Sequence, residues 1–268
     1  MAIGLSTYAY FWRLSERVPA PMGLDAMLEN TAELGGKVFQ ICDYAPIESL
    51  SAEGLEKLRQ RAEALDVVLE LGTRGLKADH LGRYLQLARA LDAKILRSMF
   101  NSPDSRPTLD EAQQQLAQIL PEFERHEVAL CIETYEQVPT ASNLAVVKHF
   151  NSPWLGICLD PANCVAALET PKEVISSTAP YVLNLHVKDF AFSRRDGWVG
   201  FTFAGCPMGE GLLDYDAMVA EVQPDARGIN QIIEHWLPWQ EDADATCAME
   251  DAWTRHNLEF LLARQAAR

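Results

Sequence analysis

The stretch YVLNLHVKDF (Tyr181–Phe190) begins as an apolar run and ends in three ionisable residues, His186, Lys188 and Asp189. A short, continuous apolar run is typical of a strand that is covered on both faces, as in a parallel sheet. Ionisable side chains are costly inside such a strand unless they have partners. We therefore expect them at its carboxyl end, where they can hold an ion or a substrate.

Seven further runs of this kind occur along the chain: IGLST from Ile3, VFQICD from Val38, VVLELG from Val67, KILRSMF from Lys94, VALCIET from Val128, WLGICLD from Trp154 and NQIIEHW from Asn230. Segments with helical periodicity alternate with them. One begins at the N-cap residue Ser51, one opens with the capping box Thr108–Glu111, and one closes the chain over residues 254–268.

Eight strand–helix units in strict alternation predict an α/β fold, a (β/α)8 TIM barrel forming a single domain over residues 1–268. An open, doubly wound sheet is the alternative, but no glycine-rich phosphate loop follows the first strand. The even spacing is broken between strands seven and eight by AFSRRDGWVGFTFAGCPMGEGLLDY (residues 191–215). The insertion follows a strand, so it lies at the carboxyl-end face of the barrel. Insertions at that face usually build or cover the active site. We expect its glycines Gly205, Gly209 and Gly211 to serve backbone turns.

The composition excludes several classes of partner. The net charge is −15, from 38 acidic and 23 basic residues, so we expect neither nucleic-acid nor membrane-surface binding. No apolar run approaches the roughly 18 residues of a membrane-spanning helix. The N-terminal stretch has no basic leader and no small-residue cleavage site, and the six cysteines form no C-x-x-C pair. These features predict a reduced, cytoplasmic protein.

Four consecutive strands end in residues that can bind a metal: Glu133, Asp160, His186 and Glu234. Strand ends converge over one cavity in such a barrel. Three carboxylates at close range repel each other, and a divalent cation would relieve that repulsion. Three oxygens and one imidazole nitrogen suit Mn²⁺ or Mg²⁺ best, with Co²⁺ and Zn²⁺ as alternatives. The other interpretation gives each acid a salt-bridge partner and makes His186 an ordinary core histidine.

The motifs CIET, CLDPAN, LHVKD and IIEHW resemble the xylose-isomerase-like barrel superfamily, which includes sugar 3-epimerases, hydroxypyruvate isomerases, inosose dehydratases and the AP endonuclease IV group. The resemblance implies that the four residues hold a divalent metal and that Glu133 and Glu234 are also the catalytic acid and base. Two positions depart from the pattern: Asn163 and Asn184 stand where relatives often have histidine. With six histidines in all, the multi-zinc cluster of the endonucleases is not expected.

Cations and aromatic residues near the strand ends indicate the chemical class of the substrate. Arginine binds carboxylate or phosphate through a bidentate fork, and sugars stack on aromatic rings. No phosphate-binding loop is visible, which favours a carboxylate-bearing sugar acid or a neutral keto sugar. For each residue, an ion pair or core packing is the alternative role. The candidate substrate-binding residues are Trp12, Arg74, Arg97, Asn163, Lys188 and Arg194.

The expected reaction starts from an enediolate, formed when one glutamate removes a proton beside a metal-bound carbonyl. Reprotonation then gives an isomerase or epimerase acting on a small keto sugar or sugar acid. A lyase is the alternative, either a decarboxylase of a 3-oxo sugar acid or a dehydratase. The stretches STYAYFWR, FQICDY and GEGLLD are similar to the sugar-acid lyase branch, including 3-oxo-isoapionate decarboxylase-like proteins. A non-catalytic sugar-binding protein is least favoured, and the expected assembly is a homodimer or homotetramer.

Overall fold

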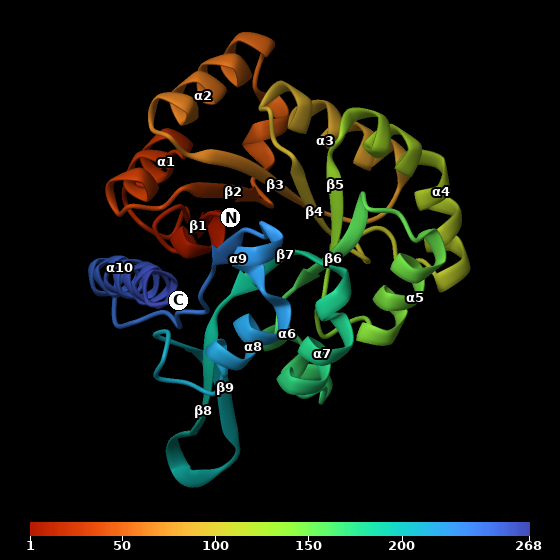
Figure 1. The fold of residues 1–268 in the computed structure, drawn as a ribbon. Helices are drawn as coiled ribbons and strands as arrows, with labels where there is room; N and C mark the ends of the chain where they lie inside the picture. Colours follow the sequence, from red (N-terminus) through yellow and green to blue (C-terminus); the bar gives the residue numbers. More distant parts are fainter.

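The computed structural model describes residues 1–268 and contains a closed barrel of eight parallel strands in the order β1-β10-β7-β6-β5-β4-β3-β2 (Figure 1). Each predicted apolar run forms one strand, and the predicted (β/α)8 barrel is confirmed. The barrel strands are β1 (Ile3–Ser6), β2 (Val38–Cys42), β3 (Val68–Arg74), β4 (Ile95–Met99), β5 (Ala129–Glu133), β6 (Leu155–Leu159), β7 (Val182–Val187) and β10 (Gln231–Ile233).

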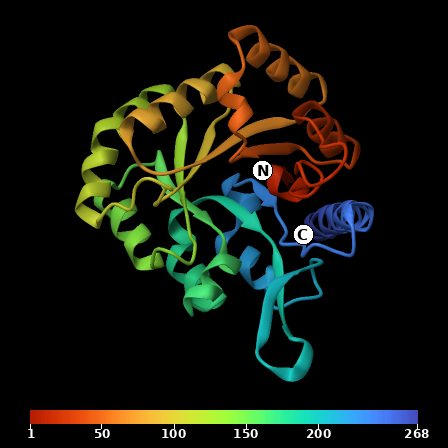
Figure 2. The same ribbon diagram turned by 180° about the vertical axis from the view of Figure 1, so that it is seen from behind.

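Helices surround the barrel and cover the outer faces of the strands (Figures 1 and 2). This cover explains the continuous apolar runs, because every residue of β2, β5 and β6 is buried. The helices are α1 (Leu24–Glu33), α2 (Ala52–Ala64), α3 (Ala78–Ala90), α4 (Leu109–His126), α5 (Thr140–Phe150), α6 (Pro161–Cys164), α7 (Pro171–Thr178), α8 (Tyr215–Val222), α9 (Pro224–Arg227) and α10 (Ala243–Ala266).

Side-chain caps fix where several of these helices begin. Ser51 accepts a hydrogen bond from the amide of Gly54, and the capping box at Thr108 is present, as predicted. The last helix is longer than its apolar periodicity predicts, since Asp242 accepts a hydrogen bond from the amide of Ala245 and starts it at Ala243. None of the helices has the length and hydropathy needed to cross a membrane. All six cysteines are free.

The insertion between β7 and β10 is a two-stranded antiparallel hairpin, β8 (Asp189–Arg194) and β9 (Phe201–Cys206), which projects from the barrel (Figures 1 and 2). Its base lies against the end of β10, where the amide of Gly205 donates to the carbonyl of Trp236 at 3.1 Å. A Cβ at Gly205 would lie 2.8 Å from backbone atoms of Trp236, so only glycine allows this approach. The hairpin base therefore borders the face of the barrel at the carboxyl ends of the strands, while its tip points away.

Asp189, the last residue of the LHVKD motif, organises the loop that follows the hairpin. Its carboxylate accepts hydrogen bonds from the amides of Phe190, Gly209, Gly211 and Leu213 at 2.8–3.0 Å. Gly209 has a φ of +87°, and a Cβ at Gly211 would collide with Asp189 itself. These two glycines serve the backbone turn, as the sequence predicts, and Asp189 has a structural role.

Candidate metal site at the carboxyl ends of the strands

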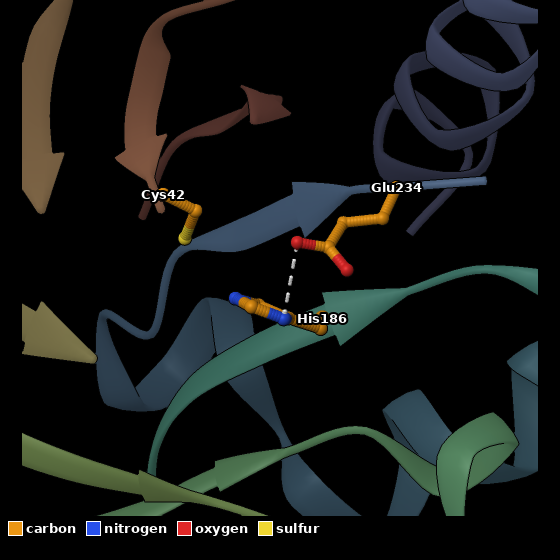
Figure 3. A group of neighbouring side chains, drawn as sticks. All are labelled: Cys42, His186 and Glu234. Carbon is orange, nitrogen blue, oxygen red and sulfur yellow. Dashed lines mark ion pairs between the residues drawn. The ribbon is translucent and has the colours of Figure 1, made fainter. Parts of the chain in front are cut away.

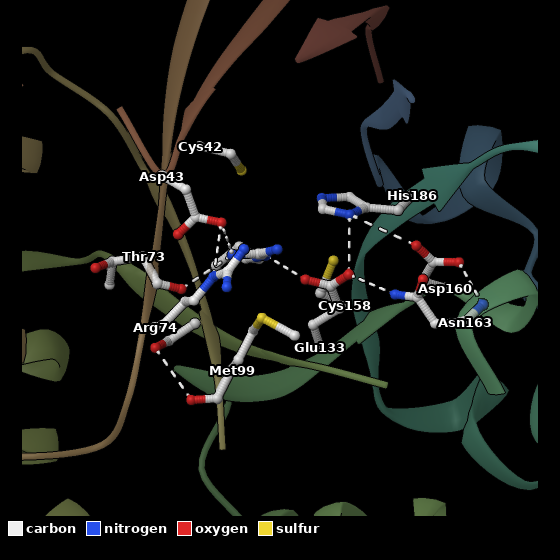
Figure 4. Close-up of polar contacts among 12 residues, drawn as sticks. Cys42, Asp43, Thr73, Arg74, Met99, Glu133, Cys158, Asp160, Asn163 and His186 are labelled. Carbon is white, nitrogen blue, oxygen red and sulfur yellow. Dashed lines mark hydrogen bonds and ion pairs between the residues drawn. The ribbon is translucent and has the colours of Figure 1, made fainter. Parts of the chain in front are cut away.

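The structure brings the four predicted metal ligands together. Glu133 ends β5, Asp160 follows β6, His186 lies in β7 and Glu234 follows β10. One ligand atom from each lies within 4.8 Å of the ligand atoms of the other three. Nδ1 of His186 is 3.4 Å from Oε1 of Glu234, 3.5 Å from Oε1 of Glu133 and 4.0 Å from Oδ2 of Asp160 (Figures 3 and 4).

These residues fit a divalent cation on two observations of the structure. All four side chains are buried, yet Nδ1 of His186 makes no hydrogen bond. A buried polar atom without a partner is rare in folded proteins unless water or an ion satisfies it. The donor set is also suitable, because three carboxylate groups and one imidazole nitrogen match the preference of Mg²⁺ or Mn²⁺ for oxygen-rich sites.

Two buried cations compensate part of the negative charge. Nζ of Lys188 lies 2.7 Å from Oδ2 of Asp160 and 2.9 Å from Oε2 of Glu234. The guanidinium of Arg97 forms an ion pair with Glu133 and donates to the carbonyl of Thr73 at 3.0 Å. The salt-bridge interpretation thus holds in part, but three carboxylates face two permanent cations. The remaining negative charge calls for a proton on the histidine or a metal ion.

The environment shifts the pKa of each member of the cluster. Burial acts to raise the pKa of Glu133, but the charges of Arg97 and His186 outweigh it and hold that pKa below its usual value. The pKa of Glu234 is lowered as well, because His186 and the nearby lysine outweigh its burial. For Asp160 burial prevails and raises the pKa to about 6. Burial alone would lower the pKa of His186, but the two glutamates raise it. Both glutamates are therefore carboxylates at neutral pH.

Asn163, predicted to bind substrate, belongs to the cluster. Its side-chain amide donates to Oε1 of Glu133 at 2.9 Å, and its backbone amide donates to Oδ1 of Asp160 at 3.2 Å (Figure 4). Ser6, at the end of β1, donates from its hydroxyl to Oε1 of Glu234 at 3.0 Å. Ser6 was not singled out from the sequence, although its place at a strand end is the same signal that indicated the glutamates.

Arg74 lies at the mouth of the barrel, at the end of β3. Its Nε is 3.0 Å from Oδ2 of Asp43 (Figure 4), and its Nη2 donates to the hydroxyl of Tyr8 at 2.7 Å. The same Asp43 oxygen accepts from the Tyr8 hydroxyl at 2.7 Å and lies 3.4 Å from Nη1 of Arg97. Asp43 therefore links the two arginines. Asp43 is the last residue of the second run, VFQICD, and this position at a strand end could have marked it.

Trp12 lines an apolar pocket of about 620 Å³ together with Phe11, Phe203 and Trp236. Its indole N–H donates to the carbonyl of Leu237 at 2.6 Å, which fixes the ring. The pocket borders the metal-ligand cluster, because the ammonium of Lys188 lies 4.5 Å from the centre of the Trp236 ring. Aromatic rings, including that of the candidate Trp12, thus line a pocket beside the carboxylates.

Arg194 does not reach the cluster in this structure. It ends β8 in the projecting hairpin, where its guanidinium lies over the Phe201 ring at 4.4 Å from the ring centre. The sequence placed it near the site because it follows strand seven closely. The antiparallel pairing of β8 with β9 instead extends the chain away from the barrel.

Cys42, at the end of β2, forms a second group of ligand atoms with His186 and Glu234 (Figure 3). Its thiol donates to Oε1 of Gln40 at 2.9 Å, and burial raises its pKa well above the usual value. A thiol that stays protonated is a poor metal ligand. The set with three carboxylates is therefore the better candidate for a hard divalent cation.

Comparison with known proteins identifies the family of the chain. Residues 28–264 match the family model described as xylose isomerase-like TIM barrel. The chain is 64% identical over 264 residues to the 3-oxo-isoapionate decarboxylase of Pectobacterium atrosepticum, covering 98% of this chain and 96% of that protein.

Two solved structures share the fold at low sequence identity. A D-psicose 3-epimerase from Clostridium cellulolyticum, solved with D-tagatose, superimposes with a TM-score of 0.73 at 14% identity, over 97% of this chain and 98% of that one. A xylose isomerase-like TIM barrel protein from Mycobacterium smegmatis, solved with magnesium, gives 0.70 at 16% identity, over 96% of each chain. With the family match over most of its length and a decarboxylase as a near relative, the chain is an enzyme that belongs to the xylose isomerase-like TIM barrel family.

Proposed function

We propose that the protein is a divalent-metal-dependent decarboxylase of a 3-oxo sugar acid, with 3-oxo-isoapionate as the substrate. The observation that carries this proposal is the 64% identity, over nearly the whole chain, to a protein of that name. The isomerase or epimerase expected first has support only from the fold, at 14–16% identity. The lyase alternative is therefore the better supported of the two.

Glu133, Asp160, His186 and Glu234 are the proposed ligands, and Mg²⁺ or Mn²⁺ the proposed ion. When bound, the cation supplies positive charge next to the substrate oxygen on which negative charge develops. Arg97 and Asn163 contribute by holding Glu133 from two sides, through an ion pair and a hydrogen bond at 2.9 Å. This glutamate is thereby fixed in a geometry suited to ligation.

Decarboxylation of a 3-oxo acid requires that the carboxylate be held while its bond to the neighbouring carbon breaks. The bonding electron pair moves toward the ketone oxygen, and CO₂ leaves. We propose Arg74 as the group that binds the carboxylate, because Nε and Nη2 are held by Asp43 and Tyr8 while Nη1 makes no hydrogen bond in the structure. The fixed guanidinium then presents its remaining donors to an anion at the barrel mouth.

One proton must be added to the carbon that loses CO₂. Nζ of Lys188 donates a hydrogen bond to Oε2 of Glu234 at 2.9 Å. We propose that a proton passes from Lys188 through Glu234 to the carbon, with solvent restoring the ammonium afterwards. Trp12 and Trp236 line the adjacent apolar pocket, which limits the access of water to the reacting atoms.

The direct test is to remove bound metal with a chelator, restore Mn²⁺ or Mg²⁺, and add 3-oxo-isoapionate. We expect CO₂ release that depends on the metal and one solvent deuterium incorporated per turnover in D₂O. A panel of neutral keto sugars, assayed in parallel for epimerisation, is the comparison. Epimerisation of a keto sugar without CO₂ release from the 3-oxo acid would overturn the proposal in favour of the epimerase.

Location and assembly are also part of the proposal. We expect a cytoplasmic homodimer or homotetramer in which the chain 1–268 works as one catalytic unit. Light scattering coupled to size-exclusion chromatography measures the assembly. A large excess of acidic residues argues against nucleic-acid or membrane partners.

A further inference from the structure

A network of polar side chains lies inside the barrel next to His186. Gln40 on β2 and Glu70 on β3 occupy paired positions in adjacent strands. Asn184 precedes His186 by two residues on β7, so both side chains point into the barrel. These three network residues are buried, and Asn230, just before β10, completes the group. None of them is among the proposed metal ligands.

Glu70 is the acceptor at the centre of this network. Its Oε1 accepts from the amide of Asn230 at 2.7 Å, and its Oε2 accepts from the amides of Gln40 and Asn184, both at 2.9 Å. Burial raises the pKa of Glu70, and the hydrogen bonds from the three side-chain amides oppose that shift. In its ionised form the carboxylate can only accept hydrogen bonds. The side-chain amides around it must therefore turn their NH₂ groups, not their oxygens, toward Glu70.

The orientation of Gln40 follows from this requirement. Its NH₂ group donates to Glu70 and to Oδ1 of Asn184, the latter at 3.1 Å, so both N–H bonds are used. Its oxygen consequently faces the other way, 2.7 Å from Nε2 of His186. An amide oxygen cannot donate, so Nε2 must carry the proton. In a neutral imidazole this leaves the lone pair on Nδ1, the atom that faces the three carboxylates.

We propose that Glu70 is a positioning residue that fixes the tautomer of His186 through Gln40. The chain Glu70–Gln40–His186 keeps Nδ1 free of a proton and directed at the cluster, ready to bind a metal. Asn184, which stands where relatives often have histidine, is a partner in this network and not an additional ligand. The proposal rests on the proposed use of His186 as a ligand and is independent of the identity of the substrate.

The test compares three variants with the wild type. Glu70→Gln keeps the shape of the side chain but introduces a donor, so that Gln40 can turn over and present its NH₂ group to His186. Gln40→Met removes the acceptor while keeping a side chain of similar length. Glu250→Gln is the control, since Glu250 is also a fully buried carboxylate but lies outside the network, where it accepts from the backbone amides of Trp12 and Arg13 and pairs with the Arg13 side chain.

Two readouts are needed, and neither depends on turnover. The first is the tautomer of His186, measured by ¹⁵N NMR at alkaline pH on metal-free protein that carries ¹⁵N-labelled histidine. The signal of His186 is identified because it is lost in the His186→Gln variant. The second is Mn²⁺ affinity, measured by titration calorimetry. We expect wild type and Glu250→Gln to hold the proton on Nε2. In Glu70→Gln and Gln40→Met the proton should shift to Nδ1 or divide between the nitrogens, and Mn²⁺ should bind about 10–100-fold more weakly.

The outcomes separate this inference from the proposed function. An unchanged Nε2 proton and unchanged Mn²⁺ affinity in both network variants would overturn the role of Glu70. An equal shift in Glu250→Gln would show a general effect of losing a buried charge, which would also overturn it. If the wild type binds no Mn²⁺, the proposed metal-dependent function fails, while the tautomer comparison still decides the role of Glu70.

Discussion

Replacing Lys188 by methionine should destabilise the metal-free protein strongly. The Lys188 side chain is 3% exposed, and its ammonium lies between Asp160 and Glu234, at 2.7 and 2.9 Å. Breaking a buried ion pair by removing one partner typically costs about 3–5 kcal/mol, because the other charge stays buried and uncompensated. For a chain of this size each kcal/mol lowers Tm by about 2–4 °C, so the expected fall is about 6–20 °C.

Scanning calorimetry after chelator treatment measures this change, and Lys37→Met is the matched control. Lys37 forms an exposed ion pair with Asp66, and such pairs contribute about 1 kcal/mol or less. Mn²⁺ at 100 times its Kd for the Lys188→Met variant should stabilise that variant by about 2.7 kcal/mol, the mass-action gain of a ligand that binds only the folded state. A fall in Tm no larger than in the Lys37 variant would refute the assignment of Lys188 as the counter-charge of the carboxylate cluster.

Three further predictions concern the ligands and the substrate. Asp160→Asn should retain the fold, seen by circular dichroism, but bind Mn²⁺ more weakly in calorimetry; unchanged affinity would remove Asp160 from the site. Glu234→Gln should lower kcat for CO₂ release by about 10²–10⁴-fold, because Glu234 passes the proton to the carbon in the proposed reaction; near-normal turnover would assign that role elsewhere. Arg74→Ala should raise KM or lower kcat at least about tenfold on the 3-oxo acid but little on a neutral keto sugar, with Arg59→Ala on helix α2 as control, since Arg59 is partly exposed and pairs with Glu56. Equal losses on both substrates would contradict a carboxylate-binding role.

The sequence by itself determined the barrel and most of the cluster. Continuous apolar runs predicted strands buried on both faces, and their regular alternation with helical segments left few other architectures. Once the strands are parallel and closed into a barrel, residues at corresponding strand ends must converge. Glu133, Asp160, His186 and Glu234 could therefore be identified by position and chemistry alone, and the structure places their ligand atoms within 4.8 Å of one another.

The tertiary structure decided what surrounds the cluster. Arg194 and Arg97 looked equivalent in sequence, yet the hairpin carries Arg194 away while Arg97 pairs with Glu133. Glu70 lies in the middle of an apolar run and gave no signal, because its hydrogen-bond partners come from residues 40, 184 and 230. The physical reason is that strand periodicity fixes which way a side chain points, whereas its partners across the barrel depend on closure and register. Those contacts between residues far apart in sequence exist only in the folded chain.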